Sequence, residues 1–251
     1  MNILVTNDDG ITSEGISVLA DVLGREHDVW IAAPDRERSA VSHGITFREP
    51  VKFHRIGDRT YSCSGTPADC VLYALHGAVP VQFDLVVSGI NRGENIGTDI
   101  IYSGTVSAAR QAVLHGIPGI AVSAGALNPS YVEAAKLLMR ELPALLDISH
   151  MHMVLNINVP DGYDPEEGIA AAVPCIKAGG NQVHPYYRSA DEVFFFLSEF
   201  REEKLTHIEA FTDADALRAG KASVTALAVQ PMVHGETMER VMELYAKRGS
   251  R

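Results

Sequence analysis

Two adjacent carboxylates near the start of the chain are the residues best suited to chemistry. Asp8 and Asp9 follow residues 3–5, a short β-branched and leucine run that is typical of a buried parallel strand. They stand in a turn, residues 7–10, and residues 15–23 then read as a helix. Neighbouring carboxylates repel each other unless a cation lies between them, and a hard divalent ion such as Mg²⁺ or Mn²⁺ is the natural partner. A turn of Asn and Asp that caps the next helix explains the same residues equally well.

Two neutral oxygen donors, Ser39 and Asn91, follow other predicted strands. Residues 28–33 read as a strand, and the charged loop behind it ends at Ser39. Residues 83–88 form a later strand that runs into the loop containing Asn91. Carboxyl ends of parallel strands meet at one edge of a sheet, so we expect both side chains near the carboxylate pair. The alternative for Ser39 is a turn serine or a helix N-cap, which is the commoner use of serine.

A glycine-rich segment, residues 89–99, leads into a helix start that is suited to bind an anion. It holds three glycines and two asparagines, and Ser103-Gly104-Thr105 then precedes a helix predicted over residues 106–115. The first N–H groups of a helix have no partner within it, and the helix dipole favours negative charge there. Because eleven loop residues exceed what a connection needs, we favour a phosphate site over an ordinary capping sequence.

The elements that position these residues alternate between strands and helices. Residues 131–146 form a long amphipathic helix, and residues 153–159 form a strand stopped by a Pro-Asp-Gly turn. Repeated alternation of this kind predicts an α/β fold with a doubly wound, mostly parallel sheet. The sequence has neither the P-loop nor the dinucleotide fingerprint, which disfavours a nicotinamide-dependent oxidoreductase.

The pattern changes after residue 160. Residues 170–177 and 192–198 read as antiparallel strands, and residues 236–247 read as a terminal helix. Tyr186 and Tyr187 lie between the two strands, where they could grip a base or a partner subunit. An exposed aromatic hairpin is at least as typical of a dimer contact.

Composition and charge exclude several classes of protein. The 251-residue chain has 32 acidic and 21 basic residues and a net charge of −11, which argues against a protein that coats nucleic acid. Its three cysteines, Cys63, Cys70 and Cys175, lack CxxC spacing and predict buried thiols in a reducing compartment. No apolar run is long enough to span a membrane, and no signal peptide precedes the first strand. We therefore expect a cytoplasmic protein.

Five ordered blocks of the sequence resemble the signature blocks of the SurE (survival protein E) family. They are residues 7–10 (NDDG), 33–39 (APDRERS), 64–70 (SGTPADC), 88–93 (SGINRG) and 102–106 (YSGTV). The likeness runs almost unbroken from residue 1 to about 125, and thinly through residues 156–160 to the end. That family comprises metal-dependent 5′/3′-nucleotidases, which act as acid phosphatases on nucleoside monophosphates.

The resemblance implies a fold, a metal site and a mode of assembly. The fold is a Rossmann-like core, residues 1–160, followed by residues 161–251, whose hairpin and terminal helix are used in a homodimer or homotetramer. One strand of this C-terminal part is expected to return to the core. The implied ligands of one Mg²⁺ or Mn²⁺ ion per subunit are Asp8, Asp9, Ser39 and Asn91. The implied phosphate-binding residues are Asn95, Ser103, Gly104 and Thr105.

The resulting hypothesis is a phosphatase that hydrolyses nucleoside 5′- and 3′-monophosphates by metal-assisted attack of water. Asp8 and Asp9 are its catalytic residues, and the sequence leaves open whether either acts as base or nucleophile. His234 is a candidate proton donor, although a surface histidine on the terminal helix is the commoner case. The alternative is a non-enzymatic sensor of nucleotide or phosphate, which needs the anion site but no free metal position.

The chain departs from the family pattern at three places. Arg110-Gln111 stands where the family usually has an acidic residue, and Gln230 stands in the last strand where Asp is common. Residues 178–190 are only partly similar. These departures bear on substrate preference and assembly, because none of them touches the implied metal ligands.

Overall fold

The computed structural model describes residues 1–149, 152–178, 181–189, 191–199, 204–206, 208–231 and 235–246. Its strands are β1 (Asn2–Thr6), β2 (Asp28–Pro34), β3 (Phe53–Arg55), β4 (Thr60–Cys63), β5 (Leu85–Arg92), β6 (Gly119–Ala124), β7 (Met153–Val159), β8 (Ile169–Ala171), β9 (Ile176–Ala178), β10 (Asn181–Arg188), β11 (Val193–Glu199), β12 (Lys204–Thr206) and β13 (Ala222–Ala228). Its α-helices are α1 (Glu14–Leu23), α2 (Pro67–Tyr73), α3 (Gly104–Leu114), α4 (Tyr131–Ile148), α5 (Asp213–Arg218) and α6 (Gly235–Ala246). Shorter helical turns are η1 (Ala74–Ala78), η2 (Gly97–Ile101) and η3 (Pro165–Glu167).

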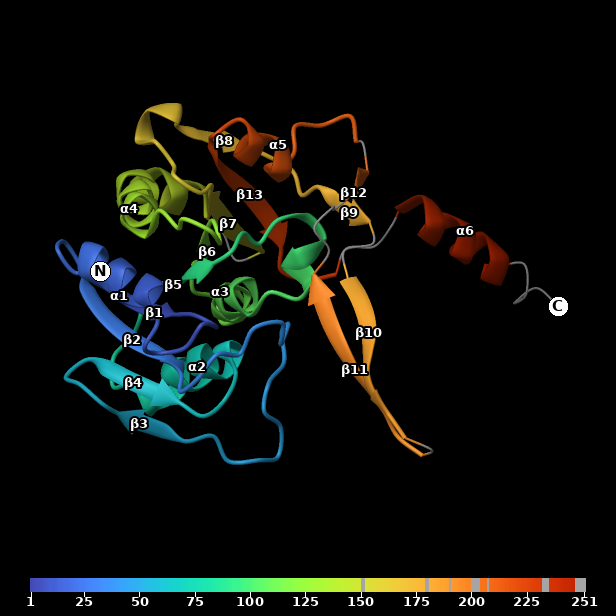
Figure 1. The fold of residues 1–251 in the computed structure, drawn as a ribbon. Helices are drawn as coiled ribbons and strands as arrows, with labels where there is room; N and C mark the ends of the chain where they lie inside the picture. Colours follow the sequence, from blue (N-terminus) through green and yellow to red (C-terminus); the bar gives the residue numbers. More distant parts are fainter. Residues whose placement is uncertain are drawn as a thin grey trace.

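A nine-stranded sheet with the order β3-β4-β2-β1-β5-β6-β7-β13-β8 forms the centre of the molecule (Figure 1). Neighbouring strands run parallel except at its β3–β4 and β7–β13 junctions. Helices α1 and α4 pack together on one face of the sheet, and α2 and α3 pack together on the other. The predicted fold class, a mostly parallel α/β sheet with a C-terminal hairpin and helix, is confirmed.

The two hydrophobic cores follow from the periodicity of the strands and helices. In β1, Ile3 and Val5 point to the α1–α4 side, while Leu4 points to the α2–α3 side. In α1, Ile16 and Leu19 lie one helical turn apart and are both fully buried against the sheet. Because both faces of the central strands are covered, these strands are mostly hydrophobic, and the exceptions include buried polar residues such as Ser88 and Asn156.

Strand β5 is longer than the sequence predicts. The predicted strand, residues 83–88, was expected to end at Gly89, but β5 continues to Arg92. With η2 behind it, the eleven-residue loop that favoured a phosphate site is reduced mainly to residues 93–96, so that part of the argument was wrong. A Cβ atom at position 89 would lie 2.3 Å from the carbonyl oxygen of Val122, so this glycine permits close strand contact and does not mark a turn.

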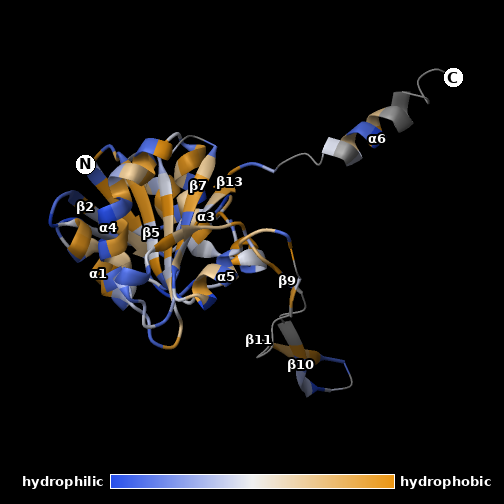
Figure 2. Cartoon of the chain, turned by 90° about the horizontal axis from the view of Figure 1, so that it is seen from above, coloured by the Kyte–Doolittle hydropathy of each residue, from blue (hydrophilic) through white to orange (hydrophobic). Residues whose placement is uncertain are grey.

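The C-terminal strands also pair differently from the prediction. Strand β11 pairs antiparallel with β10, and not with residues 170–177. Those residues contribute instead to β8, which pairs with β13, and to β9, which pairs with β12. Pro185 obscured β10 in the sequence, because proline is rare within strands; here it lies beside a register shift in the ladder. The hairpin and α6 project from the core, and β11 is mostly hydrophobic (Figures 1 and 2).

Two expectations about the class of protein can be compared with the described residues. Cys63, Cys70 and Cys175 are free and buried, as predicted. Within the described ranges, none of the helices has both the length and the apolar character needed to cross a bilayer.

The close packing of α1 on β5 yields a testable prediction. A Cβ atom at Gly15 would lie 2.0 Å from the carbonyl oxygen of Ile90, so Gly15→Ala must push the helix away from the strand. We expect the free energy of unfolding to fall by about 1–3 kcal/mol in urea titration, although alanine favours a helix. Ser17→Ala, on the exposed side of the same helix, is the control and should change stability by less than about 0.5 kcal/mol. Equal stability of Gly15→Ala and the wild type would contradict this packing.

Candidate metal and anion site

Asp8 and Asp9 lie directly after β1, at the carboxyl edge of the sheet. The side chain of Asn7 shapes the turn. Its Oδ1 accepts the N–H of Gly10 at 3.1 Å, and its Nδ2 donates to the Ser13 hydroxyl at 2.7 Å. Neither aspartate caps α1, because its N-cap is Ser13. The turn and the carboxylate pair are therefore separate features, and the two side chains face the neighbouring loops.

The Asp8 carboxylate lies against the first turn of α3. The Thr105 hydroxyl donates to Asp8 Oδ1 at 2.5 Å. A Cβ atom at Gly104 would lie 2.8 Å from Asp8 Oδ2, so only glycine permits this approach. Burial raises the pKa of Asp8, and the Thr105 hydroxyl with the backbone amides of Gly104 and Thr105 partly offsets that effect. Ser103 caps the helix by accepting the N–H of Val106 at 3.0 Å.

Asp9 is held on the opposite side of the pair, by β5. Its Oδ2 accepts the backbone N–H of Arg92 at 3.1 Å. Burial, and next the charge of Asp8, raise the pKa of Asp9 to about 6. Across the described residues, no ion pair joins Asp8 or Asp9 to a basic side chain. Two adjacent carboxylates that are buried and have no basic partner suit a divalent cation between them.

The residues next to Ser39 and Asn91 contact the pair through their backbone N–H groups, whereas the side chains of Ser39 and Asn91 form hydrogen bonds with other residues. The N–H of Arg38 donates to the backbone oxygen of Asp8 at 2.7 Å, which brings the loop after β2 beside the carboxylates. The Ser39 hydroxyl donates to Glu37 Oε1 at 2.9 Å. Asn91 donates its side-chain N–H to the oxygen of Gly93 at 2.8 Å, so its side-chain oxygen is the atom suited to a cation.

The donor set fits Mg²⁺ or Mn²⁺ better than a transition metal that needs His or Cys. In the part of the chain that the structure describes, no three His, Cys, Asp or Glu side chains are grouped to hold a metal. A cation at Asp8 and Asp9 would therefore also need neutral oxygens and water, as these two ions accept. The assignment of Ser39 and Asn91 as ligands stays a prediction.

Asn95 is fixed between β6 and β7. Its backbone N–H donates to Asn158 Oδ1 at 2.7 Å, and its side-chain N–H donates to the Ser123 hydroxyl at 2.8 Å. Its carbonyl oxygen accepts the amide of Asn156 at 2.9 Å. Asn95 thus anchors the loop before α3, and its predicted contact with phosphate stays untested. Alternating asparagines on β7 were the sequence signal for this anchor, since they share one face of the strand.

Two fully buried aspartates hold the loops around the site, and sequence reasoning did not assign them this role. Asp69, which forms the capping box of α2 with Thr66, accepts the hydroxyl of Thr46 at 2.6 Å as well as the N–H of Thr66 at 2.9 Å. Asp213 accepts the N–H of Gly97 at 2.8 Å and so fixes η2. Only the capping pattern T-x-x-D signalled Asp69. His234, the candidate proton donor, lies outside the described residues.

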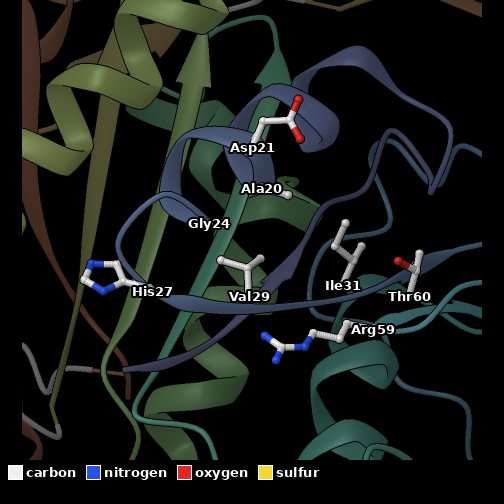
Figure 3. Close-up of a pocket in the computed structure, with 8 residues that line it drawn as sticks. All are labelled: Ala20, Asp21, Gly24, His27, Val29, Ile31, Arg59 and Thr60. Atoms are coloured by element: carbon white, nitrogen blue, oxygen red, sulfur yellow. The ribbon is translucent and has the colours of Figure 1, made fainter.

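A pocket of about 240 Å³ lies elsewhere in the structure (Figure 3). It is lined by the end of α1 and the starts of β2 and β4, with Val29, Ile31 and Arg59 among its side chains. These are the amino ends of the strands, so the pocket opens at the edge opposite Asp8 and Asp9. None of the predicted site residues lines it.

The raised pKa of Asp9 predicts how stability depends on pH. Its folded value is about 6, against 3.8 as the ordinary value, so the folded state binds more protons between these values. The free energy of unfolding attributable to Asp9 therefore falls as pH rises from about 4 to 6. We expect Asp9→Asn to stabilise the metal-free protein at pH 7 by about 1–2 kcal/mol, an estimate reduced because the carboxylate is partly exposed.

Urea titration at pH 7 and pH 5 measures this effect, which should be smaller at pH 5. Mn²⁺ should stabilise the wild type but not Asp9→Asn, because only the wild type keeps both carboxylates. Asp21→Asn, which alters an exposed carboxylate on α1, is the control and should have little effect at either pH. A loss of stability in Asp9→Asn at pH 7 would contradict the charge repulsion inferred here.

Comparisons with known proteins show which family the sequence and the fold resemble. The sequence model of a family described as Survival protein SurE matches residues 3–180. A protein named 5′-nucleotidase SurE from Clostridium botulinum is 47% identical over 184 residues, which cover 70% of this chain and 72% of that protein. One of the same name from Cyanothece sp. is 38% identical over 248 residues, or 90% of each protein. The crystal structure of the SurE protein from Aquifex aeolicus matches 98% of this chain and 100% of its own, with a TM-score of 0.83 and 36% identity. The chain belongs to the SurE family.

Proposed function

We propose that this chain is a metal-dependent nucleotidase that hydrolyses nucleoside 5′- and 3′-monophosphates to nucleoside and phosphate. The observation that carries the proposal is the Asp8–Asp9 pair, with Asp8 held against the first turn of α3 by Thr105. A cation site and an anion site then share one edge of the sheet, which suits phosphoryl hydrolysis. The relatives named 5′-nucleotidase support a nucleotide as the substrate.

The metal would be held by two carboxylates and two neutral oxygens. The proposed ligands of one Mg²⁺ or Mn²⁺ ion are Asp8, Asp9, Ser39 and Asn91. When bound, such an ion polarises a phosphoryl oxygen and lowers the pKa of a water molecule. The hydrogen bonds from Thr105 and from the N–H of Arg92 keep the two carboxylates in fixed orientations for this role.

The first turn of α3 would bind the phosphate. The positive end of the helix dipole favours negative charge at this turn, and the hydroxyls of Ser103 and Thr105 stand at its start. Ser103 directly precedes this turn, and Asn95 anchors the loop that leads to it. As water attacks phosphorus, the P–O bond to the nucleoside breaks, and the leaving oxygen takes a proton.

Phosphate release from 5′- and 3′-nucleotides with Mg²⁺, Mn²⁺ or EDTA tests the proposal. We expect release with a divalent ion and none with EDTA, and Asp8→Asn should lower kcat/KM by about two to three orders of magnitude. Thr105→Val keeps the side-chain volume but removes the hydrogen bond to Asp8, so it should lose activity that Thr105→Ser retains. Circular dichroism checks that each variant is folded.

Two results would contradict the proposal. One is phosphate release that EDTA does not affect, and the other is an active Asp8→Asn variant. Binding of inorganic phosphate without release from any nucleotide would instead favour the alternative function, a sensor of nucleotide or phosphate.

We also propose that the chain forms a homodimer or homotetramer through its C-terminal part. The hairpin β10–β11 exposes eight large hydrophobic side chains, far more apolar surface than a solvated hairpin needs. They are Val183, Tyr186, Tyr187, Val193, Phe194, Phe195, Phe196 and Leu197. Because consecutive strand residues point to opposite faces, Phe194, Phe195 and Phe196 make both faces of the ribbon apolar. A second copy of the chain would cover a surface of this kind.

A charged substitution in the hairpin tests this assembly. We expect Phe195→Asp to convert the wild-type oligomer to monomer, measured by light scattering with size-exclusion chromatography, because an unpaired carboxylate would be buried in the interface. Leu127→Asp is the control. Leu127 is 90% exposed and lies outside the hairpin, so this substitution should leave the mass unchanged. A monomeric wild type would contradict the proposal.

The location that we propose is the cytoplasm. Three free, buried thiols support a reducing compartment. Fractionation of cells that produce the protein, followed by detection of the chain, would test it.

A further inference from the structure

We propose that His43 is a positioning residue of the candidate site, which through Gln111 on α3 fixes the loop of residues 39–46 that carries Ser39. Its bearing on catalysis rests on the proposed function, but its effect on the loop does not. A chain of polar side chains that the proposed reaction does not use joins this loop to α3. His43, Gln111 and His115 are linked by hydrogen bonds between the loop and α3.

The loop has a conformation that its own sequence does not favour. Ala40 and Ser42 have φ values of 60° and 53°, in the left-handed region that L-residues rarely adopt. Neither residue is a glycine or an asparagine, so the backbone conformation must be imposed by contacts with the rest of the molecule. The contacts that impose it therefore also set where Ser39 lies.

Contacts made by Ser42, His43 and Thr46 tie the loop to the core. Ser42 donates its N–H to the oxygen of Tyr102 at 2.9 Å, just before α3 begins. His43 Nε2 lies 2.7 Å from Gln111 Oε1, within α3. Thr46 donates its hydroxyl to Asp69 of α2 at 2.6 Å. Among these three, His43 is the one whose ring reaches the body of α3.

The protonation state of this link follows from its surroundings. Gln111 is 7% exposed, and its Nε2 lies 3.0 Å from Nε2 of His115, so its amide donates to His115 and its oxygen accepts from His43. Burial, and the nearby Arg110, lower the pKa of His43 against the opposing effect of Gln111. His43 is then neutral near pH 7 and donates through Nε2, so the link joins one donor to one acceptor.

Helix α3 connects the His43–Gln111 bond to the candidate site. Thr105 in its first turn holds Asp8, and Gln111, six residues further along, holds His43. Six residues of helix span about 9 Å, which is less than two turns of a rigid element. Asp8 and the Ser39 loop are therefore positioned relative to the same helix. Loss of the His43–Gln111 bond would remove the loop's contact with the body of α3 and so loosen the loop, while the contacts of Ser42 and Thr46 remain. Asp8 would stay in place, because its bond from Thr105 is unaffected.

The experiment compares His43→Ala, His43→Gln, Gln111→Ala and the double variant His43→Ala/Gln111→Ala. Glutamine at position 43 has a donor of similar reach, so it should restore what alanine loses. His27→Ala is the matched control, because His27 is also partly buried but lies at the opposite edge of the sheet. Two readouts need no substrate: hydrogen exchange of the amides of residues 40–46, and the affinity for Mn²⁺ alone.

We expect His43→Ala and Gln111→Ala each to speed exchange in the loop and to weaken Mn²⁺ binding about five- to tenfold, as loss of one hydrogen bond implies. The double variant should resemble either single one, since both remove the same bond. His43→Gln and His27→Ala should behave like the wild type. With substrate, the alanine variants should lose kcat/KM in proportion to the lost Mn²⁺ affinity, while saturating Mn²⁺ restores most of kcat.

Unchanged exchange in His43→Ala would overturn the inference, as would additive effects in the double variant or failure of His43→Gln to restore the loop. These outcomes are distinct from failure of the proposed function. A wild type that releases no phosphate from any nucleotide refutes the nucleotidase, while exchange in residues 40–46 still decides whether His43 fixes the loop.

Discussion

Asp8 and Asp9 place two negative charges side by side at the end of the central strand, and burial raises the pKa of both. Water screens the buried Asp8 hardly at all and Asp9 only in part, so the surrounding elements must supply hydrogen-bond donors. Thr105 supplies one for Asp8, and the N–H of Arg92 supplies one for Asp9. The first turn of α3 and the end of β5 are therefore needed for the carboxylate pair to exist in a folded chain.

Backbone groups contact the carboxylate pair directly, whereas several side chains hold the surrounding loops. The backbone N–H of Arg92 contacts Asp9, and glycine at position 104 lets Asp8 lie close to the start of α3. Glycine at position 89 lets β5 lie close to Val122 of β6. Side chains such as Asp69 and Asp213 act one layer further out, where each joins two loops that are distant in sequence. A cation bound by only two carboxylates would depend on these outer contacts, because they hold the loops from which neutral ligands would come.

Local pattern was enough to predict the fold class and the residues near the strand ends. The hydrophobic pattern that identifies a strand or a helix lies within that element. Residues 7–10 are recognised as a turn by their composition alone. The end of β5 was misread because Gly89 serves a contact with Val122, which is not visible in the neighbouring residues. The bond between His43 and Gln111 joins positions 68 residues apart, and no local signal marks either partner.

The C-terminal part cannot be separated from the site as simply as the change of pattern at residue 160 suggests. Strand β13 covers the edge of β7 along six residue pairs, so a chain that ended at residue 160 would leave that edge open. Asp213 on α5 also accepts the N–H of Gly97, 116 residues away, and so supports η2 directly before α3. The helix that positions Asp8 is thus held from both halves of the sequence. A boundary at residue 160 describes the sequence pattern, whereas the smallest unit able to hold the site includes α5 and β13.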